Sequence, residues 1–220
     1  MFNLDSVKGV FCQNPCEKAL LIAKKYNLPL VVDAPDTSLY IYVNKRIGLY
    51  HSSFANPFFP LYKIVKKEPI HQAIGKAKSI LDITAGWGVD ADKLRQFDKS
   101  VTLVEQNPLI YLILKDTLDF YGYKNEEVIN SESSIFLKNN TKAYDAIYFD
   151  PMRGPKKRAN GKSISLIQKL AFPDDKWEEL LYVAKTMSPK VILKTPCFKS
   201  IPKPTRIIKG VNTHFAIYES

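Results

Sequence analysis

Hydrophobic positions in the C-terminal two thirds of the chain follow two alternating periods. From Ile80 onward, short apolar runs rich in Val, Ile, Leu and Tyr are separated by longer stretches with helical spacing. This alternation predicts parallel strands joined by crossover helices, the pattern of an α/β fold. The predicted strands are Ile80–Thr84, Val101–Glu105, Val128–Asn130, Tyr144–Asp150 and Val191–Thr195, followed by Thr205–Lys209 and Phe215–Tyr218. The clearest predicted helices are Pro108–Tyr121 and Asp174–Met187.

The first sixty residues have a different pattern. Asn14-Pro15-Cys16-Glu17 combines an N-cap residue, a first-turn proline and a capping-box acid, and it predicts a helix that ends at about Tyr26. Three strand-like runs follow at Leu28–Asp33, Ser38–Asn44 and Ile47–His51, and the turns between them predict an antiparallel meander. We therefore expect a small α/β unit at residues 1–60. A Rossmann-like domain with a mostly parallel sheet and an antiparallel last strand is expected at residues 61–220.

Composition narrows the class of protein. The 220 residues are 45% hydrophobic, which suits one ordinary domain with a small extension. No run approaches the roughly 18 apolar residues of a membrane span, and the N-terminus lacks the features of a signal peptide, so we expect a cytoplasmic protein. Three cysteines are too few for a disulfide framework, and Cys12 and Cys16 lack the second pair that a zinc site needs. The formal charge of +10 favours a polyanionic partner, although solvated surface lysines have the same composition.

A candidate ligand loop follows the predicted strand Ile80–Thr84. Asp82 lies near the end of this apolar run, and Gly86 and Gly88 come just before a predicted helix. Glycines let a backbone approach a ligand closely, and the amides at the start of a helix face it. The loop lacks the lysine of a P-loop and the third glycine of a dinucleotide fingerprint, which disfavours a pyrophosphate ligand. Taken alone, the two glycines fit an ordinary tight turn equally well.

Glu105 strengthens the interpretation of this loop. It ends the next apolar strand, about twenty residues further on, where an acidic side chain can accept both hydroxyl groups of a ribose. A glutamate facing solvent at a strand end is the alternative. The combination of the acid, its spacing and the glycine loop favours ribose binding.

Two further features follow the predicted strand Tyr144–Asp150. Asp150 and Pro151 lie at the edge where open α/β sheets bind ligands, and a carboxylate before a proline-stiffened turn can hold an amine by hydrogen bonds. The same dipeptide also occurs in ordinary turns. A cationic loop comes next, and its contacts with phosphates would orient a nucleic acid without reading its sequence, although a solvated loop has the same composition. Its cationic residues are Arg153, Lys156, Lys157, Arg158 and Lys162.

Residues 60 to 218 resemble the RsmJ-type ribosomal RNA methyltransferases. The shared motifs are Asp82-x-Thr84-Ala85-Gly86-x-Gly88-x-Asp90, Glu105-x-Asn107-Pro108, Asp150-Pro151-Met152, Lys194-x-Pro196 and the ending Gly210…His214-Phe215-x-Ile217-Tyr218. The resemblance implies a Rossmann-like class I methyltransferase that uses S-adenosylmethionine to methylate N2 of a guanine in 16S ribosomal RNA. Val89 departs from the family pattern, which commonly has arginine there, and Arg153-Gly154 replaces an aromatic residue and a proline.

The resemblance also implies roles for individual residues. Asp150 and Pro151 are expected to be catalytic, and no metal is expected. S-adenosylmethionine is expected to bind Asp82, Ala85, Gly86, Gly88, Val89, Asp90, Glu105, Gln106, Glu132, Ser133 and Asp150, with Glu132 and Ser133 next to the adenine. RNA is expected to contact Lys194 as well as the cationic loop. Two alternatives stay open: a methyltransferase acting on another RNA, a small molecule or a protein, and a non-catalytic RNA-binding protein with a decayed donor pocket.

Overall fold

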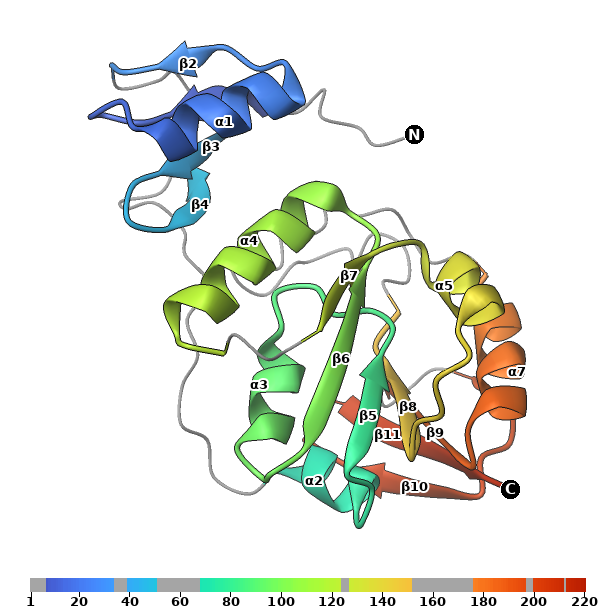
Figure 1. The fold of residues 1–220 in the computed structure, drawn as a ribbon. Helices are drawn as coiled ribbons and strands as arrows, with labels where there is room; N and C mark the ends of the chain where they lie inside the picture. The colour runs from blue at the N-terminus through green and yellow to red at the C-terminus, as the bar shows by residue number, and fades with distance from the viewer. Residues whose placement is uncertain are drawn as a thin grey trace. The chain divides into compact units, whose positions relative to one another are not determined.

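The computed structural model describes residues 7–33, 39–50, 68–123, 127–151, 176–196, 200–211 and 213–220. These residues form two compact units (Figure 1). The first unit contains residues 7–33, 39–50 and 112–123, and the second contains the rest of the described chain. Helix α4 (Pro108–Phe120) begins in the second unit and continues into the first.

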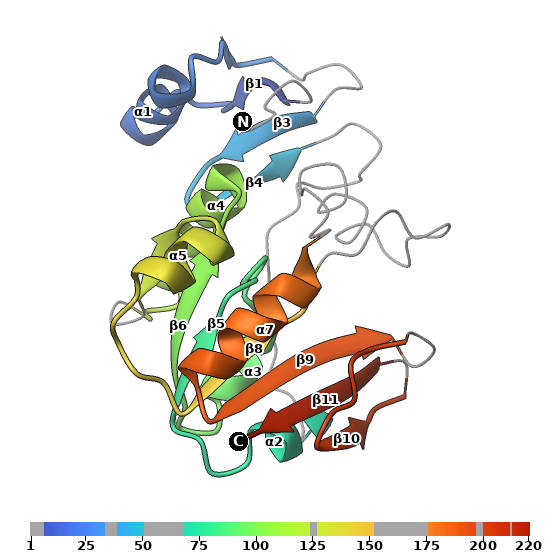
Figure 2. The ribbon, with the colours of Figure 1, turned by 90° about the vertical axis from the view of Figure 1, so that its right-hand side faces the viewer.

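The second unit is built on a seven-stranded sheet (Figure 2). Its strands are β5 (Ser79–Asp82), β6 (Ser100–Glu105), β7 (Val128–Asn130), β8 (Ala146–Phe149), β9 (Lys190–Pro196), β10 (Arg206–Lys209) and β11 (Thr213–Glu219). They follow the order β10-β11-β9-β8-β5-β6-β7. Strands β5 to β9 pair in parallel, whereas β11 is antiparallel to both β9 and β10. The predicted parallel sheet with an antiparallel last strand is confirmed.

The chain enters the parallel part of this sheet at β5 and builds outward in both directions. Strands β6 and β7 extend the sheet on one side of β5, and β8 and β9 extend it on the other. Such a reversal of strand order opens a crevice at the carboxyl ends of the strands, where α/β proteins bind their ligands. The segments that follow β5, β6 and β8 therefore meet at one edge.

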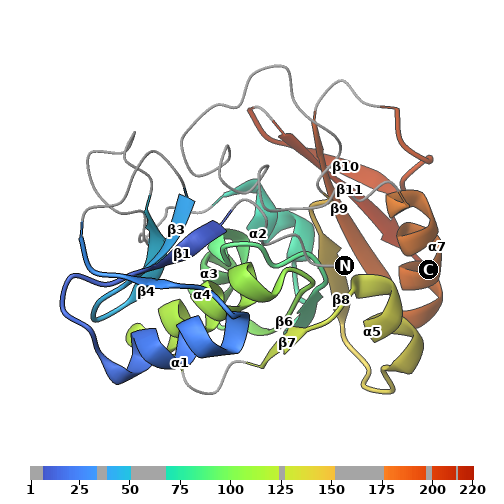
Figure 3. The same cartoon turned by 90° about the horizontal axis from the view of Figure 1, so that it is seen from above.

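Helices cover both faces of the sheet (Figure 3). Helix α3 (Val89–Arg95) packs on β6 and contacts α2 (Pro69–Ile74), whereas α5 (Ser133–Asn139) and α7 (Trp177–Met187) contact each other on the other face. Because the central strands are covered on both faces, their sequences are continuous apolar runs, and all four residues of β8 are buried. The core against α5 and α7 includes Leu81, Ile147 and Phe149. Among the described residues, no helix has the length and apolarity needed to cross a membrane.

The first unit contains a smaller, four-stranded sheet. The strands of this sheet are β1 (Val7–Phe11), β2 (Leu30–Val31), β3 (Leu39–Val43) and β4 (Ile47–Tyr50), in the order β2-β1-β3-β4. Helix α1 (Glu17–Tyr26) lies between β1 and β2 in the sequence. Only β3 and β4 pair in an antiparallel hairpin, because β1 lies between β2 and β3 and is parallel to both. The antiparallel pairing predicted for β3 and β4 is confirmed, whereas the prediction that β2 belongs to the same meander was wrong.

The unpredicted strand β1 explains this difference. Gly9 interrupts the apolar pattern of β1, which hides the strand in the sequence. Glycine is needed there because a Cβ atom would lie 2.8 Å from the carbonyl oxygen of Pro29. That carbonyl accepts a hydrogen bond from the backbone N–H of Val10 at 2.8 Å. Helix α1 then supplies the crossover that a parallel neighbour requires. It ends at Tyr26 as predicted, but Cys16 rather than Asn14 is its N-cap residue.

The hairpin and α1 are tied to the second half of α4 within this unit. Asp116 accepts a hydrogen bond from the backbone N–H of Ile47 at 2.7 Å and forms an ion pair with Lys18. The buried Arg46 donates a hydrogen bond to Oγ1 of Thr117 at 3.1 Å. These contacts give the small sheet a polar anchor on a helix that is distant in sequence.

Candidate active site

Glu105 organises the glycine loop that follows β5. It is buried at the end of β6, where its Oε2 accepts a hydrogen bond from the N–H of Gly86 at 2.8 Å. Its Oε1 accepts one from the N–H of Asn107, also at 2.8 Å. A carboxylate is an acceptor-only group, and each of its oxygens can accept more than one hydrogen bond. Glu105 therefore shapes the loop from the position at which the sequence predicted a ribose acceptor.

The loop requires glycine at two positions. Gly86 and Gly88 have φ values of 53° and 74°, in the left-handed region that side chains disfavour. Their backbone is fixed on both sides, because the N–H of Ala85 donates to the oxygen of Val104 at 3.0 Å and that of Gly88 donates to the oxygen of Ala85 at 2.9 Å. The tight turn brings backbone rather than side chains to the edge of the sheet.

Asp82 lies fully inside the protein, beneath this loop. It is 2% exposed, and its Oδ1 accepts a hydrogen bond from the N–H of Thr84 at 3.0 Å. Burial raises the pKa of Asp82 from 3.8 to about 8, and the charges of Asp90 and Asp150 act in the same direction. Asp82 is therefore mostly protonated at neutral pH.

Asp90, in the first turn of α3, is the centre of a hydrogen-bonded cluster. Its Oδ2 accepts hydrogen bonds from the hydroxyl group of Tyr148 at 2.7 Å and from Nζ of Lys194 at 2.6 Å. Lys93 lies 3.7 Å from the other oxygen. Burial by itself would raise the pKa of Asp90, but Lys194 and these other donors hold it below its ordinary value. Asp90 is thus a fixed negative charge.

Asp150 reaches the same cluster from the end of β8. Its Oδ2 lies 3.0 Å from Nζ of Lys194, and its side chain is 44% exposed. The backbone N–H of Asp150 donates to Oγ1 of Thr84 at 2.7 Å, which ties the turn after β8 to the loop after β5. Pro151 is buried behind it. An accessible carboxylate is thus held beside the glycine loop.

The two residues expected near an adenine lie at the start of α5. Glu132 is exposed and is the N-cap residue of α5, whereas Ser133 is buried and donates a hydrogen bond to the oxygen of Ile83 at 2.5 Å. Asn130 donates to the backbone oxygens of Glu105 and Gln106 at 2.8 and 3.2 Å. These bonds join the ends of β5, β6 and β7.

A family model described as "Putative SAM-dependent methyltransferase" matches residues 17–220. The chain belongs to this family. The predicted cofactor, S-adenosylmethionine, is the cofactor for which the family is named, and the family assignment confirms that prediction.

Individual relatives agree with this family. "Ribosomal RNA small subunit methyltransferase J" of Coxiella burnetii is 32% identical over 152 residues, which are 64% of this chain and 60% of the relative. The protein of the same name in Francisella tularensis is 31% identical over 173 residues, 70% of this chain and 72% of the relative. The chain thus spans about 60% of the length of the Coxiella relative.

A solved structure confirms the fold class. The SAM-dependent methyltransferase of Neisseria gonorrhoeae aligns with a TM-score of 0.71 and 17% identity, covering 96% of this chain and 95% of that protein. At this level of identity the likeness concerns the fold. It extends over both units of this chain.

The methyltransferase fold brings most of the predicted site residues to one edge. Lys194 forms ion pairs with both Asp90 and Asp150. Glu105 accepts a hydrogen bond from the loop backbone, and the buried Asp82 is close enough to feel the charges of Asp90 and Asp150. Val89 is 48% exposed at the start of α3. The cationic residues Arg153, Lys156, Lys157, Arg158 and Lys162 lie outside the described residues.

Sequence reasoning did not assign two residues of this site, Tyr148 and Thr84. Tyr148 is buried within an apolar strand, and its hydroxyl group is detectable as a partner of Asp90 only in three dimensions. Thr84 belongs to the family motif, and nothing else in the sequence indicated that it contacts Asp150. Lys194 was expected to contact RNA, yet here it pairs with two carboxylates.

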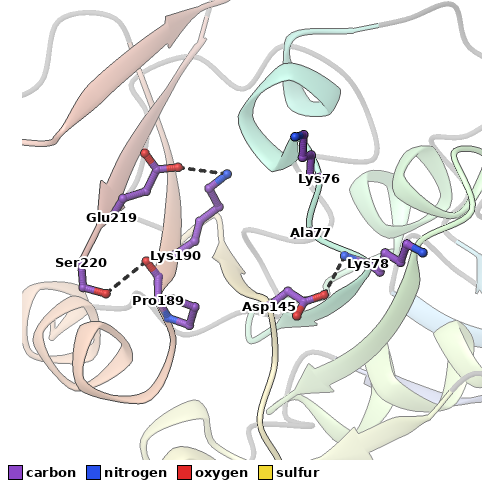
Figure 4. Close-up of a pocket in the computed structure, with 8 residues that line it drawn as sticks. All are labelled: Lys76, Ala77, Lys78, Asp145, Pro189, Lys190, Glu219 and Ser220. Carbon is purple, nitrogen blue, oxygen red and sulfur yellow. Dashed lines mark hydrogen bonds and ion pairs between the residues drawn. The ribbon is translucent and has the colours of Figure 1, made fainter.

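A surface hollow of about 640 Å³ lies at the opposite edge of the sheet (Figure 4). Three of its charged groups already have partners, since Lys190 pairs with Glu219 at 3.1 Å and Asp145 accepts the N–H of Lys78 at 2.8 Å. Sheets of this type bind ligands at the carboxyl ends of their strands, so this hollow is not part of the candidate active site. Within the described segments, no group of His, Cys, Asp and Glu is placed to hold a metal ion.

Proposed function

We propose that this protein transfers a methyl group from S-adenosylmethionine to the exocyclic N2 of a guanine in 16S ribosomal RNA of the small subunit. The observation that carries the proposal is the hydrogen bond between the N–H of Asp150 and Thr84, which places an accessible carboxylate beside the glycine loop. The two named relatives, both ribosomal RNA small subunit methyltransferases, support the substrate class. The formal charge of +10 is in keeping with RNA binding.

The residues at this edge fit the donor. The left-handed glycines Gly86 and Gly88 leave room for a close approach of backbone to ligand, with Ala85 and Val89 beside them. Glu105 is assigned to the ribose hydroxyl groups, because it lies at the end of β6 beside the loop and each oxygen of a carboxylate can accept more than one hydrogen bond. Glu132 and Ser133 are assigned to the adenine, and Gln106 to the donor site as a whole. Asp90 and Asp150 are assigned to the positively charged end of the donor, with the protonated Asp82 beneath the loop.

The protein's part in the reaction is mainly alignment. S-adenosylmethionine supplies a methyl group that is activated by its bond to a positively charged sulfur. An exocyclic guanine amine becomes acidic only as the new bond forms, so no strong base is needed before attack. Asp150 accepts the amine hydrogen bonds, and the turn at Pro151 fixes the direction of approach. The neighbouring cationic loop, Arg153 to Lys162, would hold the RNA by its phosphates.

Donor binding can be tested by calorimetry on two variants and a control. Glu105→Ala removes the ribose acceptor and is expected to weaken binding by about 1 to 3 kcal/mol. Gly86→Val obstructs the close backbone approach and should also weaken binding. Glu127→Ala, an exposed glutamate paired with Lys142, is the matched control and should bind normally. Equal donor affinity in all four folded proteins would refute the assignment.

The acceptor can be identified by incubating the protein with labelled donor and unmethylated small ribosomal subunits, followed by mass spectrometry of the nucleosides. N2-methylguanosine is the expected product. N6-methyladenosine, a methylated pyrimidine or a methylated ribose would overturn the acceptor assignment. Turnover only on a small molecule or a protein would overturn the RNA assignment, and donor binding without turnover on any acceptor would indicate a non-catalytic protein.

The role of Asp150 has its own test. Asp150→Ala should lower turnover by a factor of about a hundred or more while RNA affinity is largely kept, because the cationic loop supplies that affinity. Asp150→Asn should lose less, since one acceptor oxygen remains. Full turnover by Asp150→Ala would show that the aspartate only forms the turn.

A further inference from the structure

Lys194 connects the two carboxylates on which the proposed function depends. Its Nζ lies 2.6 Å from Oδ2 of Asp90 and 3.0 Å from Oδ2 of Asp150. Asp90 belongs to the helix that follows the glycine loop, and Asp150 to the turn proposed to hold the methyl acceptor. One ammonium group therefore bridges the donor side and the acceptor side of the site.

The strand that carries Lys194 is rigidly placed. Strand β9 pairs with β8 through Leu193 and Phe149, and with β11 through Lys194 itself and Phe215. Hydrogen bonding on both sides fixes the backbone from which the side chain extends. The side chain is only 21% exposed. Lys194 can thus hold the carboxylates of Asp90 and Asp150 from a fixed position.

The two carboxylates differ in how firmly they are held. Asp90 has a second donor, the hydroxyl group of Tyr148, and its side chain is 15% exposed. Asp150 is 44% exposed, and within the described part of the chain its ion pair is with Lys194. Since both oxygens lie within 3.0 Å of one nitrogen, they are within about 6 Å of each other, where like charges repel. Without the ammonium group, Asp150 is the carboxylate free to turn away into solvent.

The same geometry argues against a phosphate contact for Lys194. Two of its three protons are already directed at carboxylates, and a phosphate would have to displace one of them in a largely buried setting. Burial by itself would lower the pKa of Lys194, but Asp150 and Asp90 raise it well above its ordinary value, so the charge persists. We propose, on the basis of the proposed function, that Lys194 is a positioning residue that neutralises Asp90 and Asp150 and holds the Asp150 carboxylate toward the methyl acceptor.

The experiment compares Lys194→Met, which keeps most of the aliphatic stem, with Lys194→Arg, which keeps the charge. Lys190→Met is the matched control, because Lys190 begins the same strand but pairs with Glu219 at the opposite edge. Single-turnover methyl transfer to the RNA, RNA affinity as a function of salt, and the affinities for S-adenosylmethionine and its demethylated product are measured for each protein. The product lacks the positive charge of the donor, so the ratio of the two affinities reports the charge of the site.

Lys194→Met is expected to lower the methyl-transfer rate by about tenfold or more at unchanged RNA affinity and salt dependence. It should also shift the ratio of donor to product affinity several-fold toward the cationic donor, because two carboxylates lose their counter-charge. Lys194→Arg should recover most of both properties, and Lys190→Met should match the wild type.

Two results would overturn the proposal. One is an unchanged affinity ratio in Lys194→Met. The other is weaker RNA binding with a salt slope reduced by about one and a normal transfer rate, which would make Lys194 a phosphate contact. If the wild type does not methylate RNA but the affinity ratio shifts as expected, the proposed acceptor fails while the charge-balancing role of Lys194 stands.

Discussion

Asp82→Asn should make the protein more stable than the wild type as the pH rises. Asp82 is 2% exposed, and burial raises its pKa from 3.8 to about 8. Between these two pH values the folded state keeps a proton that the unfolded state releases, so the stability of the wild type falls with rising pH. Asparagine resembles the protonated acid in shape and hydrogen bonding and cannot ionise.

The size of the effect follows from the pKa. At about 1.4 kcal/mol for each pH unit, the interval between 3.8 and about 8 corresponds to about 6 kcal/mol in a fully dry site. Relaxation and water penetration reduce such penalties in real proteins. We therefore expect the free energy of unfolding of Asp82→Asn, relative to the wild type, to increase by about 2 to 4 kcal/mol between pH 5 and pH 8.

Urea unfolding at several pH values measures this difference, and Asp145→Asn is a control of opposite sign. Asp145 is exposed, and the backbone N–H groups of Ser79 and Lys78 lower its pKa. Its stabilising contribution is therefore present at neutral pH and is lost as the pH falls through its lowered pKa. A difference between Asp82→Asn and the wild type that stays constant from pH 5 to pH 8 would refute the reasoning, since Asp82 would then be ionised throughout.

Two further variants test other parts of the structure. Asp116→Ala leaves the N–H of Ile47 without its acceptor, and urea unfolding should show a free energy of unfolding lower by about 1 to 3 kcal/mol. Lys18→Ala removes only the half-exposed ion-pair partner of Asp116 and should lower it by less than about 1 kcal/mol. Equal losses in the two variants would contradict the anchoring role of Asp116. Neutralising Lys156, Lys157 and Arg158 should flatten the salt dependence of RNA binding by up to about three units of slope without changing donor affinity, and an unaltered slope would identify the loop as solvated surface.

The strands and helices of the second unit could be predicted because their signals are local. The buried parallel strands are short apolar runs bounded by polar or glycine-rich turns. The partly buried strand Val128–Asn130 was also predicted residue for residue. The first unit shows the limit of this reasoning. Its β1 has a weak local signal at Gly9, and the pairing of β1 with β2 and β3 depends on contacts that no local pattern encodes.

The fold class, the glycine loop and the carboxylates at the strand ends could be read from local sequence, because these features depend on residue type and spacing along one segment. How those groups interact depends on the folded structure. Tyr148 and Lys194 reach Asp90 across 58 and 104 residues of sequence, and the protonation of Asp82 depends on burial by the surrounding elements. The energy of a charge is set by its neighbours in space and by its distance from water, and both are properties of the folded chain rather than of any segment of it.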